Sequence, residues 1–248
     1  MAWRCSGRSN QELVDNLANA GILKTPRAIE AFSRVDRKYY VRYKHEAYQD
    51  SPSYIGHGAT ISAPHMHAHA VENLEPFLKP GANVLDVGSG SGYLLGIFHS
   101  LVSPSGNVLG IDHLPSIVAY GRANLTADPS TREHLCEDEQ SPVQPGQEKR
   151  IQNICADGRQ GSPEGYTPEG GWDVIHVGAA APTLPPALVA QLASPGRIFI
   201  PVGEAGNQAI YQIDKDAQGR VTETMLMGVS YVPLTDAERQ MGRGGTPE

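Results

Sequence analysis

The sequence lacks the features that mark several classes of protein. It has only three cysteines among 248 residues, Cys5, Cys136 and Cys155, and no two of them form a CxxC pair. Thiols this few and this widely spaced exclude a disulfide framework and a zinc ribbon. They indicate reduced cysteines, as in a protein of the cytoplasm.

Long apolar runs and clustered positive charges are also missing. No run approaches the roughly 20 apolar residues of a membrane span. The opening residues MAWRCSGRSN contain no apolar core of a signal peptide. The formal net charge is −7 and there is no long basic stripe, whereas nucleic-acid binding without sequence preference needs clustered cations. We therefore expect a cytoplasmic protein with no membrane and no nucleic-acid partner.

Five short apolar runs, each ending in Gly, Asp or Pro, dominate the chain after residue 82. They are NVLDVGSGSG, NVLGID, IQNICADG, WDVIHVG and GRIFIPVG. Runs of this kind, separated by helical stretches, are typical of buried parallel strands in a βα repeat. The stretch AIYQIDKDAQGRVTETMLMG instead predicts an antiparallel hairpin around Gln218-Gly219. The pattern predicts an α/β fold with a doubly wound, mostly parallel sheet and the hairpin at one end.

Helix signals precede the predicted sheet. Ser9 can cap a first helix, with Glu12 at the capping-box position. Thr25 and Pro26 predict the start of a second helix. A further helix, again with Pro at its start, is predicted from residue 64 to about residue 78.

The length is enough for one large α/β domain or two small ones, and we expect a single domain over residues 1–248. Residues 1–63 would supply N-terminal helices and a loop or short strand at DSPSYIGHGAT, and residues 64–248 the core. Residues 128–149 are polar, contain three of the prolines and include Glu137-Asp138-Glu139. They predict a surface insertion, expected to be mobile.

A glycine-rich loop directly follows the first predicted strand. VLDVGSGSGYL places Gly88, Gly90 and Gly92 where the backbone can turn sharply and approach a ligand at a helix N-terminus. The dinucleotide pattern would need Gly or Ala at the position of Tyr93, and no GxxxxGK[ST] motif of a P-loop occurs. The loop therefore fits neither of these two patterns, and by itself it could also be a plain strand–helix turn.

Acidic residues accompany this loop. Asp86 lies two positions before Gly88, and Asp112 ends the next strand, at the distance of about 20 residues from which an acid can bind a ribose hydroxyl pair. This order resembles class I S-adenosylmethionine-dependent methyltransferases, and it implies their Rossmann-like fold and S-adenosyl-L-methionine as cofactor. Asp157-Gly158 fits the position that borders the adenine in such folds, and ASPGRIFIPVG resembles their later Pro-Gly-strand segment.

Four stretches resemble the protein-L-isoaspartate (D-aspartate) O-methyltransferase family. They are ATISAPHMHA, DVGSGSG, HVGAAAP and MGVSYVPLTD. HVGAAAP stands where amino-methylating nucleic-acid enzymes carry an Asn/Asp-Pro-Pro-aromatic loop. The resemblance extends from Met1 to about Gln240. Two features depart from the family, the long segment 128–149 and the tail GRGGTPE.

The resemblance implies methyl transfer to the free α-carboxylate of L-isoaspartyl, and also D-aspartyl, residues in age-damaged proteins and peptides. This step would start repair through a succinimide and leave S-adenosyl-L-homocysteine. It further implies a monomer whose active-site hydroxyl is that of Ser62. The implied cofactor-binding residues are Ala59, Thr60, Ile61, Ser62, His67, Asp86, Gly88, Gly90, Ser91, Gly92, Asp112, His113, Asp157, Gly158, Thr235 and Gln240.

Other interpretations of the segment around Ser62 stay open. His65, His67 and His69 suggest a metal site, but on a helix His67 would point away from the other two and no HExxH motif occurs, so we expect no metal. Ser62 lacks the G-x-S-x-G elbow of a hydrolase and could simply cap the helix that begins near Pro64. The alternatives to a protein-repair enzyme are a small-molecule carboxyl methyltransferase and a non-catalytic substrate receptor with this fold.

Overall fold

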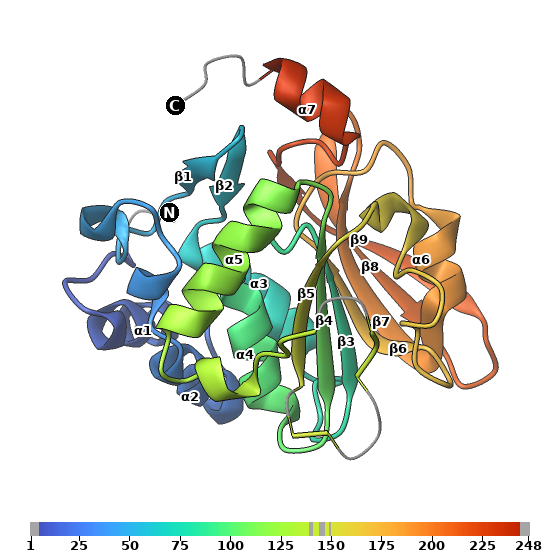
Figure 1. Ribbon diagram of the computed structural model, residues 1–248, viewed down its shortest axis with the longest axis horizontal. Coiled ribbons are helices and arrows are strands. Elements are labelled where there is room, and N and C mark those ends of the chain that lie inside the picture. Colours follow the sequence, from blue (N-terminus) through green and yellow to red (C-terminus); the bar gives the residue numbers. More distant parts are fainter. Residues whose placement is uncertain (1–4, 139–140, 144–146, 149, 244–248) are drawn as a thin grey trace.

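A central sheet of seven strands organises the molecule (Figure 1). The computed structural model describes residues 5–138, 141–143, 147–148 and 150–243. The strands are β1 (Ser53–Gly56), β2 (Ala59–Ile61), β3 (Asn83–Val87), β4 (Asn107–Asp112), β5 (Ile151–Cys155), β6 (Trp172–Val177), β7 (Leu192–Val202), β8 (Gln208–Lys215) and β9 (Val221–Val229). The helices are α1 (Asn10–Asn19), α2 (Pro26–Arg34), α3 (Pro64–Leu74), α4 (Tyr93–Val102), α5 (Pro115–Ala127), α6 (Pro186–Gln191) and α7 (Ala237–Arg243).

The strand order is β5-β4-β3-β6-β7-β8-β9. The first five strands of this order are parallel, whereas β8 and β9 are antiparallel. The mostly parallel sheet with a hairpin at one end is therefore confirmed, and each of the five predicted runs forms a strand. DSPSYIGHGAT contributes to a small separate hairpin, in which β1 pairs with β2.

Helices cover both faces of the sheet. Helices α1 to α5 lie on one side and α6 on the other (Figure 1). Alternating strand residues divide between two cores, because successive side chains of a strand point to opposite faces. Val84 and Val174 belong to the core beneath α1 to α5, while their neighbours Leu85 and Ile175 belong to the core beneath α6.

The N-terminal helices form as predicted, but their caps differ in detail. The hydroxyl of Ser9 accepts the N–H of Glu12, yet the Glu12 carboxylate accepts from Arg8 and not from Ser9, so only half of the capping box forms. Thr25 occupies the N-cap of α2 without a side-chain cap; Glu72 of α3 accepts its backbone N–H instead, at 2.9 Å.

Helix α3 ends at Leu74, earlier than the predicted end near residue 78. Lys79 directly precedes Pro80, and a residue before proline is disfavoured in the helical conformation. The helix is followed by a turn in which the N–H of Phe77 donates to the carbonyl of Leu74 at 2.9 Å.

Fewer residues of the predicted surface insertion are exposed than expected. Asp128 and Thr131 are buried, and the Tyr40 hydroxyl donates to the Asp128 carboxylate at 2.8 Å. The 3₁₀ helix η4 (Arg132–His134) follows, and Leu135 then bridges to Ile151 of β5. The prediction of a surface segment is therefore wrong for Asp128, Thr131, Leu135 and Cys136, which are buried, whereas Pro129, Arg132 and Glu133 are exposed as predicted. The predicted stretches 139–140, 144–146 and 149 lie outside the described residues.

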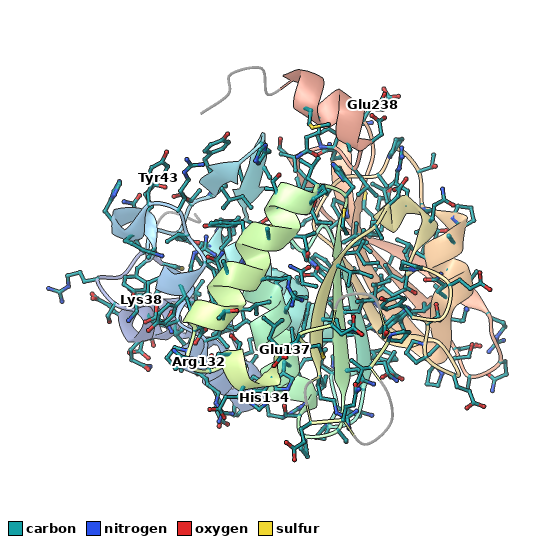
Figure 2. The ribbon with its side chains drawn as sticks, viewed as in Figure 1. Lys38, Tyr43, Arg132, His134, Glu137 and Glu238 are labelled. Atoms are coloured by element: carbon teal, nitrogen blue, oxygen red, sulfur yellow. The ribbon has the colours of Figure 1, made fainter. Side chains whose placement is uncertain are left out.

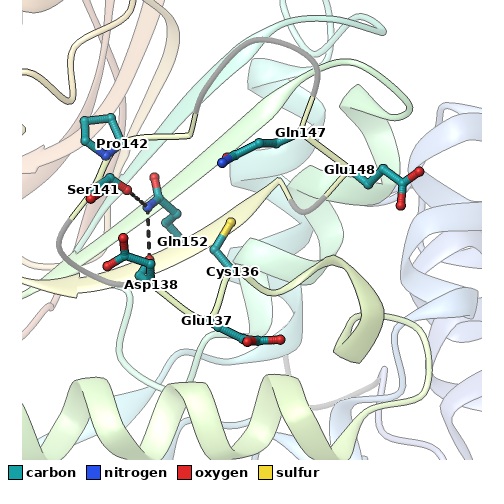
Figure 3. A pocket seen from close by; sticks show the side chains of 8 residues that line it. All are labelled: Cys136, Glu137, Asp138, Ser141, Pro142, Gln147, Glu148 and Gln152. Carbon is teal, nitrogen blue, oxygen red and sulfur yellow. Dashed lines mark hydrogen bonds between the residues drawn. The ribbon is translucent and has the colours of Figure 1, made fainter.

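Residues beyond Leu135 are attached to the edge strand β5. The amide of Gln152 donates to the carbonyl oxygens of Ser141 at 2.7 Å and of Asp138 at 3.5 Å (Figure 3). These residues help to line a cavity of about 330 Å³. Figure 2 shows His134 near the end of the sheet opposite to Glu238 of α7. The described residues of the insertion thus lie at the amino end of β5, away from the glycine loop.

No helix among the described residues has the length and apolar character needed to cross a membrane.

His99 connects α4 to this part of the chain. Its ring centroid lies 4.4 Å from that of His134, and the side chain is buried. Burial, and then the charge of His134, lower the pKa of His99 to about 4. The fold therefore favours the neutral imidazole.

We expect acid to destabilise the fold through His99. The folded pKa of about 4 lies below the unfolded value of about 6.5, so this stabilisation is present above about pH 6.5 and is lost as the pH falls towards 4. The loss is at most about 3 kcal/mol in the free energy of unfolding. His99→Gln should flatten the pH profile of urea unfolding, whereas His45→Gln, at a side chain that is 76% exposed, should not. Parallel profiles for wild type and His99→Gln would contradict this account.

Candidate active site

The glycine loop lies where the strand order reverses. The chain runs from β3 outward through β4 to β5, and then returns to β6 on the other side of β3. Open α/β sheets bind ligands at this point, beyond the carboxyl ends of the strands. Gly88 and Gly92 adopt φ angles of 77° and 81°, and Gly92 is the N-cap of α4. The predicted loop therefore lies at the position that such sheets use for binding.

Two buried polar side chains lie beneath this loop. Asp86 of β3 is in register with His176 of β6, and the Asp86 Oδ1 to His176 Nδ1 distance is 2.7 Å. Both side chains are at most 5% exposed. The ring of His176 stacks on Phe199, with centroids 6.0 Å apart. Parallel register thus holds an Asp–His pair at the floor of the site.

Ser62 separates two cavities. One, of about 40 Å³, is lined by Thr60, Ile61, Ser62, His67, Asp86, Gly88, Ser89, Gly90, Ser91, Tyr93, Leu94, His176 and Gly178. The other, of about 240 Å³, is lined by Pro52, Thr60, Ser62, Ala63, Met66, Gly178, Ser230, Tyr231 and Val232. Only Thr60, Ser62 and Gly178 belong to both linings. A group on Ser62 can therefore face a ligand in either cavity.

The side chain of Ser62 does not serve as a helix cap. Ala63 is the N-cap of α3 and makes no side-chain capping bond. The Asp50 carboxylate takes that place, since it accepts the N–H of His65 at 3.0 Å. Ser62 instead lines the larger cavity together with Tyr231, and burial raises the pKa of that tyrosine to about 12. The capping interpretation of Ser62 is therefore wrong.

His67 is the predicted histidine that reaches the small cavity. It is buried, and burial, followed by the charge of Arg37, lowers its pKa well below the ordinary value. His65 is bonded to Asp50 at 2.7 Å and His69 is half-buried. Among the described residues, no group of three or more His, Cys, Asp or Glu side chains is arranged to hold a metal ion.

The predicted residues on β4 and β5 form the rim beside the loop. The Asp112 carboxylate accepts the N–H groups of Gly90 at 3.3 Å and Leu114 at 3.2 Å, and burial raises its pKa. Asp157 is held by Arg159 through two carboxylate oxygens, the shortest distance being 2.7 Å. These acids lie at the carboxyl ends of neighbouring strands.

Two further rim residues differ in their surroundings, since one has an open polar atom and the other is tightly packed. The Nε2 atom of His113 is buried and has no hydrogen-bond partner among the described residues. A Cβ atom on Gly158 would lie 2.4 Å from Val87 Cγ1, so only glycine fits there.

The remaining predicted residues come from the two segments that border the loop. Ala59 starts β2, and Thr235 is buried. The Gln240 amide donates to the carbonyl of His57 at 2.9 Å and so links α7 to the β1–β2 hairpin. These three residues do not line the small cavity.

Three residues in or next to the two cavities were not predicted from the sequence as site residues. His176 interrupts an apolar strand, and this is a signal that a closer inspection of WDVIHVG could have used. Tyr231 lies in MGVSYVPLTD, which contributed to the family resemblance only as a stretch. Arg37 lies in the polar segment SRVDRKYY, where nothing indicates a buried arginine.

The largest of these cavities is not the candidate site. It lies in the insertion (Figure 3) and contains none of the predicted residues. The two smaller cavities meet at the strand reversal and share Ser62. Their position and chemistry make them the candidate site, although the cavity in the insertion is larger.

Comparisons with known proteins agree with this geometry. The protein-L-isoaspartate(D-aspartate) O-methyltransferase family profile matches residues 8–239. A Caenorhabditis elegans relative named protein-L-isoaspartate O-methyltransferase is 42% identical over 244 residues, covering 98% of this chain and 100% of the relative. An Arabidopsis thaliana relative, protein-L-isoaspartate O-methyltransferase 1, is also 42% identical, with 94% of each chain covered.

A solved structure supports the fold. A Plasmodium falciparum protein assigned as a protein-L-isoaspartate O-methyltransferase, in complex with S-adenosyl-L-homocysteine, is similar with a TM-score of 0.78 and 31% identity, covering 92% of this chain and 99% of that chain. The profile match and the near full-length relatives confirm the resemblance that the motifs carried. The chain belongs to the protein-L-isoaspartate (D-aspartate) O-methyltransferase family.

Proposed function

We propose that this protein transfers a methyl group from S-adenosyl-L-methionine to the free α-carboxylate of L-isoaspartyl residues in damaged proteins and peptides. The transfer converts the cofactor to S-adenosyl-L-homocysteine. Family membership supports the activity. The observation that carries the assignment to this site is the place of Ser62, between a cavity at the glycine loop and a larger cavity that opens beside it.

The residues at the strand reversal fit the cofactor. A cavity of about 40 Å³ has room for only a few heavy atoms, so we place the reacting end there, near Ser62, His67 and Ser91. The nucleoside half would lie along the rim, where Asp112 would bind the ribose hydroxyls. His113, with its buried Nε2 free of partners among the described residues, and Asp157-Gly158 would border the adenine.

The chemistry does not require a general base beside Ser62. When bound, the cofactor supplies an activated methyl group on a sulfonium cation. A carboxylate acceptor is already a nucleophile at neutral pH, so no side chain has to remove a proton. The task of the protein is to hold one carboxylate oxygen in line with the methyl group and to exclude water, which stabilises separated ions. The Ser62 hydroxyl can donate to the acceptor without neutralising it.

The larger cavity suits a main-chain acceptor. It combines apolar walls at Met66 and Val232 with the hydroxyls of Thr60, Ser62 and Tyr231. A damaged residue can occur in any protein, so its recognition must depend chiefly on backbone. We extend the proposal to D-aspartyl residues, and to repair in which the methyl ester closes to a succinimide that opens to normal aspartate.

The proposal includes a monomer acting in the cytoplasm. Cys5, Cys136 and Cys155 form no disulfide among the described residues, which suits a reducing compartment. A small-molecule carboxyl methyltransferase would instead favour free acids over peptides. A non-catalytic receptor would bind peptide and cofactor without turnover.

Asp112→Ala should weaken cofactor binding. A hydrogen bond to a charged group contributes roughly 1.5–3 kcal/mol, which corresponds to an increase in Kd of about 10- to 150-fold. Titration calorimetry with S-adenosyl-L-homocysteine measures this directly. Asp216→Ala is the control, because Asp216 pairs with Arg220 in the turn between β8 and β9. An unchanged Kd in folded Asp112→Ala protein would contradict the assignment.

Ser62→Ala should lower turnover far more than cofactor affinity. One positioned donor near dispersing charge contributes on the order of 10- to 1000-fold in rate. Ser62→Thr keeps the hydroxyl and should retain much more activity than Ser62→Ala or Ser62→Val. Turnover of an isoaspartyl peptide and the melting temperature are measured together for all three variants. Full activity of Ser62→Ala at saturating peptide would remove the role from this residue.

A further inference from the structure

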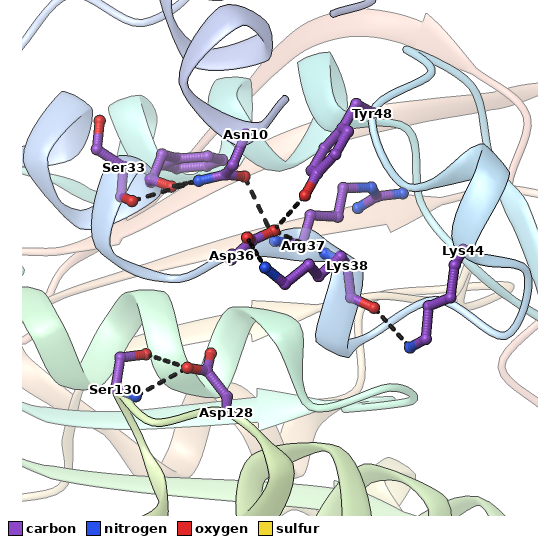
Figure 4. A network of polar contacts seen from close by, with 10 residues as sticks. Asn10, Ser33, Asp36, Arg37, Lys38, Lys44, Tyr48, Asp128 and Ser130 are labelled. Atoms are coloured by element: carbon purple, nitrogen blue, oxygen red, sulfur yellow. Dashed lines mark hydrogen bonds and ion pairs between the residues drawn. The ribbon is translucent and has the colours of Figure 1, made fainter. Parts of the chain in front are cut away.

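A buried arginine lies directly behind the proposed acceptor site. Arg37 begins the 3₁₀ helix η2 (Arg37–Tyr39) and is 0% exposed. Its backbone N–H donates to the side chain of Asn10 at 3.4 Å (Figure 4), which ties this turn to α1. The residue therefore belongs to the N-terminal helical layer, while its side chain extends to the site.

The guanidinium contacts three elements of the site. Nη2 donates to the carbonyl oxygen of Ser62 at 2.8 Å, and Nη1 lies 3.4 Å from Nδ1 of His67. The guanidinium carbon lies 5.4 Å from the centre of the Tyr93 ring, at the start of α4. One side chain thus joins the acceptor segment, the histidine of the small cavity and the end of the glycine loop.

This cation is buried without a direct ion pair. Within the described ranges, Arg37 takes part in none of the ion pairs, and its Nε has no hydrogen-bond partner. Burial lowers its pKa to about 10, so it stays charged at neutral pH. A buried cation without a direct ion pair is costly for stability, although the charge of the buried Asp50 acts on it. A fold that needed only packing here would be better served by an apolar residue.

The contact with His67 decides which ring nitrogen carries the proton. A guanidinium has only donors, so Nδ1 of His67 must be the acceptor and the proton must lie on Nε2. Buried next to a cation, the ring is kept neutral. His67 then offers one N–H, from Nε2, in the cavity that it lines.

We propose that Arg37 is a positioning residue, which fixes the Ser62 backbone for the acceptor carboxylate and sets His67 as the Nε2–H tautomer. The part that concerns Ser62 rests on the function proposed above. Arg37 itself lines neither cavity, so it acts through these two residues, which do. Its charge also lies behind Ser62, where it attracts an anionic acceptor without bonding to the attacking oxygen.

The first test uses the unaltered protein. Nitrogen-15 NMR of its histidines at about pH 7 should show Nδ1 of His67 unprotonated and Nε2 protonated. A proton on Nδ1, or a charged imidazolium, would overturn the proposal. This measurement does not depend on how any variant folds, nor on whether Ser62 contacts the acceptor.

The second test compares the same substitution, arginine to lysine, at two positions. Arg37→Lys keeps the charge, but a single ammonium cannot hold both Ser62 and His67 in the same geometry. We expect turnover of an isoaspartyl peptide to fall about 10- to 100-fold, as for a small misplacement of reacting groups, together with altered His67 nitrogen signals. Arg27→Lys is the control, because Arg27 also donates to two backbone carbonyls, those of Leu78 and Leu101, each at 2.7 Å.

Arg27→Lys should lower the melting temperature while turnover per folded molecule stays within about twofold, because none of its partners lines either cavity. Equal turnover and equal His67 signals in the two variants would reduce Arg37 to a structural residue and overturn the proposal. If Ser62→Ala were fully active while His67 kept the Nε2–H tautomer, the proposed acceptor role of Ser62 would fail and the role of Arg37 towards His67 would remain.

Discussion

The register between the parallel strands β3 and β6 determines where everything else in the site can lie. Because Asp86 pairs with His176 across this register, the residues that follow, Gly88 and Gly178, leave the sheet side by side. A Cβ on Gly178 would lie 3.0 Å from the carbonyl oxygen of Gly88. Both glycines line the small cavity, which therefore lies where the two loops leave the sheet. A shift of this register by one residue would turn each side chain of the strand to the opposite face of the sheet. It would also remove the Asp–His pair.

The acceptor side comes from a different part of the chain. Ser62 lies between β2 and α3, and its position depends on groups far away in the sequence: Asp50 caps α3, and Arg37 holds the Ser62 carbonyl. The N-terminal layer is thus more than a cover for the sheet. It brings a hydroxyl to the border between the two cavities, with a buried cation behind it.

Much of this arrangement could be predicted from local patterns. Apolar runs that end in Gly or Asp predicted the five parallel strands, since burial on both faces demands such composition. The glycine spacing and Asp112 predicted a loop at the strand reversal, which we propose binds the cofactor, because those residues act through backbone conformation and strand ends. Arg37, by contrast, becomes a site residue only through tertiary packing, and the polar segment around it resembles any exposed turn. The buried Asp128 escaped prediction for the same reason, because its partner Tyr40 is 88 residues away.

The most direct test of this account is methyl transfer from labelled S-adenosyl-L-methionine to two peptides that differ only in one linkage, L-isoaspartyl or normal L-aspartyl. The account predicts a methyl ester on the α-carboxylate of the isoaspartyl peptide, and at most background labelling of its twin. Equal labelling of both peptides, or labelling of small free acids in preference to either, would contradict it.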